Sequence, residues 1–430
     1  MKIGLTVSFF DFRNDVRQVV KALLDSHEVV IFYRQGQRKA VLANKIDGAE
    51  YREIKENVSG QNNRLARLRY RLLRSIPRSE NNFYLMEQFK LQSSGKASVL
   101  SLDNLVVQLH ALFGGRMAYD DLLQGLTYRG ETEIADVDHF LFFTEIADDE
   151  FLRRLLDSAI PVSVYVYSWD HPCKHTKFPA GVDYLVWNEG MAEDMATLQG
   201  IVTQDIEVLG ASQFCYLAEY KQHVRFTLPR PYDFEYIYIG CAVGIKSLAN
   251  QELAVIRQIA LAAGEVIPNV KVVIRPYPLL DDWELYAELA ALDNVVFDDD
   301  YRRADLGQSN LSIYEKVLKM DAALAFFHLG TTMGLECCFL DTPSFIVDLV
   351  PAEGKSAVQL YNFVHQYQNQ KYLIDAAPAN HIDTIEKLRT VLSHLDAAQY
   401  LSLNKHVQSE NNIVRFPAYA DKLVEALSSN

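Results

Sequence analysis

A strand, a turn, a helix and a second strand are predicted in close succession by the stretch Ala323-Leu-Ala-Phe-Phe-His-Leu-Gly-Thr-Thr-Met-Gly-Leu-Glu-Cys-Cys-Phe-Leu-Asp-Thr-Pro-Ser-Phe-Ile-Val347. The apolar run Ala323–Phe327 is typical of a buried parallel strand. A short polar turn, His328–Thr332, follows it, and Met333–Leu340 has the composition of a helix. Pro343 opens the next strand. This order of elements indicates an α/β fold with parallel strands.

The turn between the strand and the helix is the first candidate for a ligand site. Its small polar residues leave backbone N–H groups at the helix start open to an anion, which the helix dipole also favours. Glu336 lies one helical turn beyond Thr332, on the same face of the helix. A diphosphate held by the N–H groups of Thr331 and Thr332, with a ribose beside Glu336, suits this arrangement. The stretch therefore predicts a nucleotide-sugar site, which also includes His328 and Gly330.

An ordinary capped helix is the alternative interpretation of this turn. It would have Thr as its N-cap and Glu336 as a solvated surface carboxylate. The glycines and the position directly after a buried strand favour ligand binding instead. For His328, a contact with the donor and a place in the core are both open.

Length and composition limit the function. A chain of 430 residues exceeds one ordinary core, so two domains are expected. The formal net charge of −14 argues against a general nucleic-acid role. Five cysteines without CxxC spacing indicate buried, reduced thiols. We expect neither a signal peptide nor a membrane span, and hence a cytoplasmic location.

Two α/β halves are predicted along the chain. The first opens with strand Lys2–Ser8, helix Asn14–Ser26 and strand Glu28–Tyr33. Its later strands are expected at Val99–Leu102, His139–Thr144, Val162–Tyr167 and Tyr184–Trp187, with helices at Leu105–Phe113 and Asp148–Ser158. The segment Leu228-Pro-Arg-Pro-Tyr-Asp233 then interrupts the pattern with two prolines, and we interpret it as an interdomain linker.

The second half begins again with strand Tyr236–Gly240, helix Asn250–Gly264 and strand Lys271–Arg275. These boundaries predict an N-terminal domain at 1–228, a linker at 229–234 and a C-terminal domain at 235–415, with a helix in 416–430 that packs back toward the first domain. Both domains are expected to be Rossmann-like and to face a central cleft, because parallel sheets bind ligands at the carboxyl ends of their strands.

Further candidate residues follow other strands of the second half. Arg275 ends one strand and is suited to bidentate phosphate binding, and the prolines after it stiffen the loop that places Tyr277. A rigid turn without a ligand is the alternative. Gly240 ends another strand, and the small residues of Gly240–Gly244 allow close approach of a ligand. A plain tight turn fits that segment equally well.

Three carboxylates after strands of the first half are candidates for a general base that deprotonates an acceptor hydroxyl. Asp11 follows the first strand, although a helix start also favours a carboxylate at such a position. Asp170 follows an apolar strand, with Trp169 beside it to shield it and His171 as a partner. We prefer Asp170. Glu189 is the third candidate.

These segments resemble those of the GT-B glycosyltransferases, specifically the bacterial enzymes of cell-surface polysaccharide synthesis. The resemblance rests on Ser168-Trp169-Asp170, Val186-Trp187-Asn188-Glu189, Leu209–Phe214, Val273–Pro278 and the turn His328–Glu336. It covers most of the chain as a pattern of short motifs. It implies a nucleotide-sugar donor held by the C-terminal domain, an acceptor held by the N-terminal domain, and metal-independent chemistry without a cofactor.

One departure from the family pattern concerns the nucleotide. Related donor sites often carry His-Pro where this chain has Tyr277-Pro278. The imidazole contact to phosphate is then absent here, and Arg275 is expected to supply it. Asp298–Asp300 is predicted to be a loop, because three successive carboxylates point in different directions and repel. The sequence has no Cys/His cluster with zinc spacing, so no metal site is predicted.

A basic segment, Arg64–Arg78, contains six arginines in fifteen residues of an otherwise acidic chain. They recur at helical spacing beside an apolar stripe that includes Leu65, Leu68 and Leu72. A basic amphipathic helix suits an anionic membrane surface, and thus peripheral contact with the inner membrane face, or a lipid-diphosphate acceptor. A solvated basic face packed on the domain fits the pattern equally well.

Together these residues predict a glycosyltransferase that moves a sugar from a nucleotide-activated donor to a hydroxyl of a glycan or lipid-linked acceptor. Asp170 or Asp11 would deprotonate the acceptor, while the turn and Arg275 would stabilise the departing nucleotide. A nucleotide-sugar epimerase, a CDP-polyol phosphotransferase and a non-catalytic nucleotide- or glycan-binding module are the alternatives.

Overall fold

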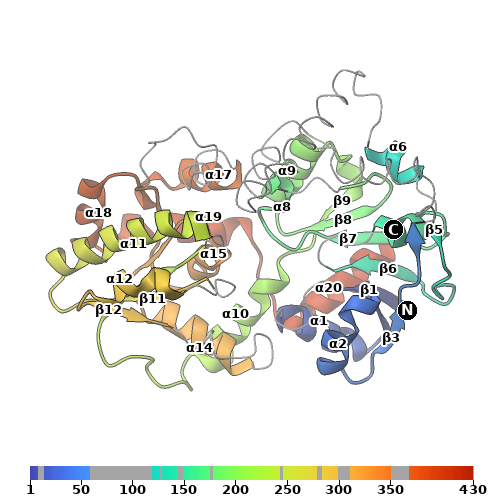
Figure 1. The fold of residues 1–430 in the computed structure, drawn as a ribbon, viewed down its shortest axis with the longest axis horizontal. Helices are drawn as coiled ribbons and strands as arrows, with labels where there is room; N and C mark the ends of the chain where they lie inside the picture. The colour runs from blue at the N-terminus through green and yellow to red at the C-terminus, as the bar shows by residue number, and fades with distance from the viewer. Residues whose placement is uncertain are drawn as a thin grey trace. The chain divides into compact units, whose positions relative to one another are not determined.

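The computed structural model describes residues 1–7, 14–58, 119–125, 128–143, 149–174, 178–242, 246–277, 283–298, 310–349 and 368–429 (Figure 1). Asp11, the basic segment Arg64–Arg78, the strand expected at Val99–Leu102 and the helix expected at Leu105–Phe113 lie outside these residues. Among the described residues, no helix combines the length and the apolar character needed to cross a bilayer.

The chain forms two compact units, each with its own core. Of the described residues, those up to Cys215 and those from Ile413 onward make up unit 1, and Tyr216–Asn412 makes up unit 2. The chain therefore enters unit 2 within the short helix α10 (Cys215–Glu219). The segment 229–234, predicted as a linker, lies inside unit 2 by this division.

Unit 1 is built on a parallel sheet with strand order β3-β2-β1-β6-β7-β8-β9. The strands are β1 (Lys2–Thr6), β2 (Glu28–Tyr33), β3 (Glu50–Glu53), β6 (His139–Phe142), β7 (Val162–Tyr165), β8 (Asp183–Val186) and β9 (Ile206–Val208). A separate antiparallel pair consists of β4 (Asn57–Val58) and β5 (Tyr128–Arg129). The helices are α1 (Asn14–Leu24), α2 (Arg38–Ala43), α6 (Tyr119–Gln124), α7 (Asp149–Leu156), α8 (His171–Lys174), α9 (Glu189–Gln199) and α20 (Phe416–Ser429).

The sheet of unit 1 is held by aromatic packing on continuous apolar strands. Phe140 lies at the centre, with ring centroids 5.3 Å from Phe32 and 5.1 Å from Phe151 of α7. Gly4 of β1 makes room for this ring, since a Cβ there would lie 2.7 Å from the Phe140 ring. The central strands are apolar on both faces because helices cover both sides of a doubly wound sheet.

Unit 2 is built on a second parallel sheet with strand order β12-β11-β10-β13-β14-β15. The strands are β10 (Tyr236–Gly240), β11 (Lys271–Arg275), β12 (Val295–Phe297), β13 (Phe326–His328), β14 (Ser344–Val347) and β15 (His381–Ile382). The chain moves outward from β10 to β12 and then returns to add β13, β14 and β15 on the other side. This is the Rossmann strand order, with its topological switch point between β10 and β13.

Helices surround the sheet of unit 2 (Figure 1). They are α11 (Lys246–Val266), α12 (Ala287–Ala290), α14 (Asn310–Asp321), α15 (Thr332–Cys338), α17 (Gln368–Ala376), α18 (Ile385–Leu392) and α19 (Ser402–Glu410). A π-helical turn, Tyr220–Val224, continues α10. Two Rossmann-like units on parallel sheets confirm the predicted α/β fold class.

Candidate functional site

The predicted strand–turn–helix is present in unit 2. β13 extends to His328, one residue further than expected, and α15 begins at Thr332. Gly330 has a φ of 108°, a left-handed conformation that favours glycine. Thr331 is the N-cap of α15, and its hydroxyl accepts a hydrogen bond from the Met333 N–H at 3.4 Å. The turn thus reverses the chain tightly at the carboxyl end of a central strand.

His328 forms a hydrogen bond within this turn. Its Nδ1 accepts a hydrogen bond from the Gly330 N–H at 3.0 Å, so the neutral ring carries its proton on Nε2. Burial lowers the pKa of His328 to about 3, and the ring is therefore neutral at pH 7. Nε2 lies over Gly334, where an added Cβ would be only 2.2 Å away, and it has no hydrogen-bond partner among the described residues.

The last residues of three neighbouring strands form a row at the switch point. Gly240 of β10 pairs with Arg275 of β11 on one side and with His328 of β13 on the other. A Cβ at Gly240 would lie 2.7 Å from the Phe326 ring and 3.5 Å from the Thr331 methyl group. Gly240 therefore leaves room for the Phe326 ring of β13, and the Thr331 methyl group lies at ordinary van der Waals distance. This row brings together the segments that the sequence analysis considered separately.

The Arg275 guanidinium lies in a buried environment at this edge. Its side chain is near Tyr238 and the Cys241 thiol, both of which have raised pKa values because they are buried, and the Arg275 charge opposes both rises. Tyr277 is half-buried two residues further along, and Pro278 lies outside the described residues. The row at the switch point thus includes a buried cation, Arg275.

Glu336 is buried, and it is not the solvated surface carboxylate of the alternative interpretation. Its Oε2 accepts a hydrogen bond from the ammonium of Lys316 on α14. The sequence motifs do not indicate Lys316 as a site residue. The available signal was a lysine on the apolar face of its helix, between Ile313 and the fully buried Val317 and Met320.

The candidate bases of unit 1 have different surroundings. Asp170 follows β7 and is half-buried, and its Oδ1 accepts a hydrogen bond from the Ser168 hydroxyl at 2.7 Å. His171 begins α8 and is buried. Glu189 is exposed in the first turn of α9, where the helix dipole favours a carboxylate. Asp11 lies outside the described residues.

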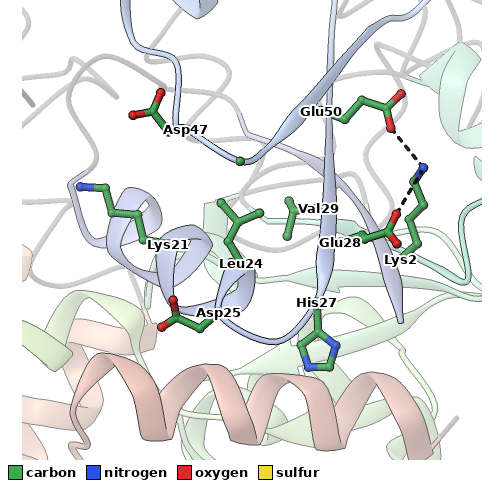
Figure 2. A pocket seen from close by; sticks show the side chains of 10 residues that line it. Lys2, Lys21, Leu24, Asp25, His27, Glu28, Val29, Asp47 and Glu50 are labelled. Carbon is green, nitrogen blue, oxygen red and sulfur yellow. Dashed lines mark ion pairs between the residues drawn. The ribbon is translucent and has the colours of Figure 1, made fainter.

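A pocket of about 500 Å³ lies elsewhere in unit 1, at the amino ends of β1, β2 and β3 (Figure 2). The Lys2 ammonium lies 3.1 Å from Glu50 and 3.7 Å from Glu28, and 2.6 Å from Asp136. Parallel sheets bind ligands at the opposite, carboxyl edge. None of the predicted site residues lines this pocket.

The described residues contain no group of three or more His, Cys, Asp or Glu side chains placed to hold a metal ion. Asp298 is buried, and its Oδ1 is paired with the Lys319 ammonium at 2.6 Å. Its Oδ2 accepts a hydrogen bond from the Tyr238 hydroxyl. Asp298 is thus part of the core of unit 2, while Asp299 and Asp300 lie outside the described residues.

Comparison with known proteins extends these observations. Neither a family model nor a curated protein matches the sequence. The solved UDP-GlcNAc 2-epimerase from Neisseria meningitidis, bound to UDP-GlcNAc, is 12% identical over 100% of both chains, with a TM-score of 0.50. The UDP-GlcNAc 2-epimerase from Methanocaldococcus jannaschii is 12% identical over 100% of both chains, with a TM-score of 0.51. The S. aureus MnaA–UDP co-structure is 10% identical over 100% of this chain and 96% of that one, with a TM-score of 0.52.

At these identities the likeness shows the fold alone. The chain has the two-domain GT-B fold that the sequence motifs predicted. The residues at the switch point of unit 2 are its candidate ligand site.

Proposed function

We propose that the protein is a GT-B glycosyltransferase of surface polysaccharide synthesis, which moves a sugar from a nucleotide-activated donor to a hydroxyl of a glycan or lipid-linked acceptor. The row of Arg275, Gly240 and His328 carries this proposal. It lies at the carboxyl ends of three adjacent strands, at the point where doubly wound sheets bind nucleotides. We place the protein in the cytoplasm, where nucleotide sugars are made.

In this proposal, unit 2 holds the donor. Arg275 and the N–H groups of Thr331 and Thr332 bind the diphosphate, and Gly240, which has no side chain, ends the strand between them. The Glu336 carboxylate accepts hydrogen bonds from the ribose hydroxyls. Tyr277, on the loop after β11, contacts the nucleotide. His328 serves the donor through the turn, because its Nδ1 holds the Gly330 N–H.

The proposed reaction is displacement at the anomeric carbon of the donor sugar. The acceptor oxygen forms a bond to that carbon while its proton passes to a carboxylate of unit 1, Asp170 or Asp11. The bond between the anomeric carbon and the diphosphate oxygen breaks, and the electron pair leaves with the nucleotide. Arg275 and the turn stabilise the charge that develops there.

A nucleotide-sugar epimerase is the second candidate, and one observation favours it. Two UDP-GlcNAc 2-epimerases are similar in structure over the whole chain, with TM-scores of 0.50 and 0.51. An epimerase converts its nucleotide sugar without a second substrate. A transferase releases nucleotide in step with glycosylation of an acceptor.

The first test is a thermal-shift screen with UDP, GDP, CMP and CDP derivatives, because a ligand at a hundredfold its Kd stabilises the fold by about 2.7 kcal/mol. The stabilising sugar nucleotide is then incubated with and without glycan acceptors. Nucleotide release that requires an acceptor supports the transferase, and epimerised donor without an acceptor supports the second candidate.

The donor site is tested with Glu336→Ala and the isosteric Glu336→Gln. We expect the affinity for the nucleotide to fall about tenfold or more, because hydrogen bonds to a charged group contribute roughly 1.5–3 kcal/mol. Glu288→Ala, at an exposed carboxylate of α12, is the control and should leave affinity unchanged. Unchanged affinity in both Glu336 variants would remove the donor-site assignment.

A further inference from the structure

Lys316 is a lysine in the core of unit 2 whose partners lie on two other elements. It is only 8% exposed, between the apolar residues of α14. Its ammonium donates to Glu336 of α15 and to the Tyr216 hydroxyl at 3.0 Å, and it lies 5.1 Å from the centroid of the Tyr216 ring. Burial of a charge is costly, and replacing a buried ion pair by apolar residues is often neutral or stabilising. Stability alone therefore gives a weak reason for this pair.

A second buried lysine on the same helix, Lys319, provides a contrast. Both carboxylate oxygens of its partner Asp298 have hydrogen-bond partners, since Lys319 donates to Oδ1 and Tyr238 donates to Oδ2. The Asp298 side chain is 1% exposed. The carboxylate of Glu336 differs from that of Asp298 in this respect. Its side chain is 7% exposed, and within the described residues only Oε2 has a hydrogen-bond partner. One carboxylate oxygen of Glu336 therefore remains able to accept hydrogen bonds.

We propose that Lys316 is a positioning residue of the nucleotide site, which orients Glu336 so that its second oxygen accepts hydrogen bonds from the ribose hydroxyls of a nucleoside diphosphate. The ammonium balances the negative charge of Glu336 and fixes one oxygen, which restricts the rotation of the carboxylate. A carboxylate oxygen only accepts hydrogen bonds, so it distinguishes a ribose from a sugar that lacks the hydroxyl donors. This inference rests on the proposed function of unit 2.

Tyr216 completes the arrangement. It is the first residue of unit 2 along α10, and its hydroxyl is the second acceptor of the Lys316 ammonium. The following turn is fixed to the same helix, since Tyr220 donates to Asp321 at 2.9 Å and Arg225 is paired with Asp321 at 2.7 Å. α14 thus holds both the segment that enters unit 2 and the carboxylate of the nucleotide site. Tyr216→Phe should weaken nucleotide binding less than loss of Lys316, because the ring remains.

The experiment compares Lys316→Met with Lys319→Met, which removes an equally buried ammonium from the same helix. Affinities for UDP, GDP and CDP, and for their 2′,3′-dideoxy analogues, are measured by calorimetry, and melting temperatures are recorded for each variant. We expect Lys316→Met to weaken binding of the ribonucleotide about tenfold, or about 1.4 kcal/mol, and to leave the dideoxy affinity unchanged. Lys319→Met should lower the melting temperature and leave both affinities unchanged.

Two further variants distinguish the positioning of Glu336 by Lys316 from a purely structural role of Lys316. Lys316→Arg should retain the preference for ribose, since it keeps a cation beside Glu336. In a Glu336→Gln background, Lys316→Met should cause no further loss of affinity, and this double variant leaves no unpaired buried charge.

The outcomes separate the two proposals. A wild-type protein that binds none of the three nucleotides would overturn both the donor site and the role of Lys316. Wild-type binding with a ribose preference that Lys316→Met leaves intact would overturn the role of Lys316 alone. Equal losses of affinity in Lys316→Met and Lys319→Met would also overturn it, because general destabilisation would then account for the effect.

Discussion

At the scale of single residues, His328 shows how neighbours in space give a motif residue its role. The sequence pattern includes His328 in the candidate nucleotide site and leaves a contact with the donor and a place in the core both open. The structure adds that its ring lies over Gly334 and that its Nδ1 holds the Gly330 N–H. Gly334 lies six residues after His328, and local sequence spacing does not show that the His328 ring packs against it.

Gly334→Ala tests this contact. A Cβ at Gly334 would lie 2.2 Å from His328 Nε2, so the buried ring must move. Overpacking of this kind costs roughly 1–3 kcal/mol, which exceeds the helix-propensity gain of about 1 kcal/mol from Gly to Ala. We expect a net decrease in the free energy of unfolding, measured by urea denaturation, and weaker nucleotide binding.

Gly190→Ala is the matched control, since Gly190 also lies in the first turn of a helix and its added Cβ would be 3.5 Å from Asn188 Oδ1. That variant should be neutral or slightly stabilised. If Gly334→Ala is as stable as the control, the close contact with His328 is not a constraint on the fold.

At the scale of elements, the C-terminal helix α20 lies against α1 in unit 1 (Figure 1). Its residues Tyr419, Leu423 and Leu427 are buried at helical spacing. The Tyr419 hydroxyl also reaches the Gly210 carbonyl at 3.3 Å. The sequence predicts an amphipathic helix that packs toward the first domain. The structure identifies its partner as α1, about four hundred residues earlier in the chain.

Leu423→Ala should destabilise unit 1. Leucine-to-alanine changes at fully buried positions cost roughly 2–5 kcal/mol, because they remove contacts and leave a cavity. Leu423 is 0% exposed. The three tryptophans, Trp169, Trp187 and Trp283, allow the affected unit to be identified. In a Trp283→Phe background, fluorescence reports on unit 1 alone, and the unfolding midpoint of that signal should fall.

The control is Leu42→Ala on α2 of the same unit, because Leu42 is 54% exposed and its loss should change stability by less than about 0.5 kcal/mol. An unchanged unit 1 midpoint in Leu423→Ala would contradict the contribution of α20 to the unit 1 core.

At the scale of the whole molecule, each unit contains a buried neutral histidine. Burial lowers the pKa of His139 in β6 to about 4 and that of His328 in β13 to about 3. An unfolded histidine has a pKa of about 6.5. Between these values the unfolded chain binds more protons than the folded chain, so stability rises with pH. The stabilisation that comes from keeping these two histidines neutral is complete above pH 6.5 and is lost as the pH falls toward their folded-state pKa values.

We therefore expect acidification from pH 7.5 to pH 5 to destabilise the protein, with about 2 kcal/mol from each histidine. His139→Gln cannot protonate and should lose about 2 kcal/mol less than the wild type over this range. Urea denaturation at both pH values, with the unit 1 tryptophans as the reporter, measures the difference. Equal losses in the two proteins would show that His139 is not buried as the structure describes.

The sequence by itself determined the two α/β halves, the α/β class and the strand–turn–helix around His328–Thr332, because apolar periodicity and turn chemistry act over a few neighbouring residues. Only the tertiary structure decided that Arg275, Gly240 and His328 form one row. It alone also decided that Glu336 is buried and paired with Lys316, and is not solvated. It also decided that the chain enters unit 2 at Tyr216 and that α20 packs against α1. These outcomes depend on strand register and on the packing of segments far apart in the chain, which local patterns do not encode.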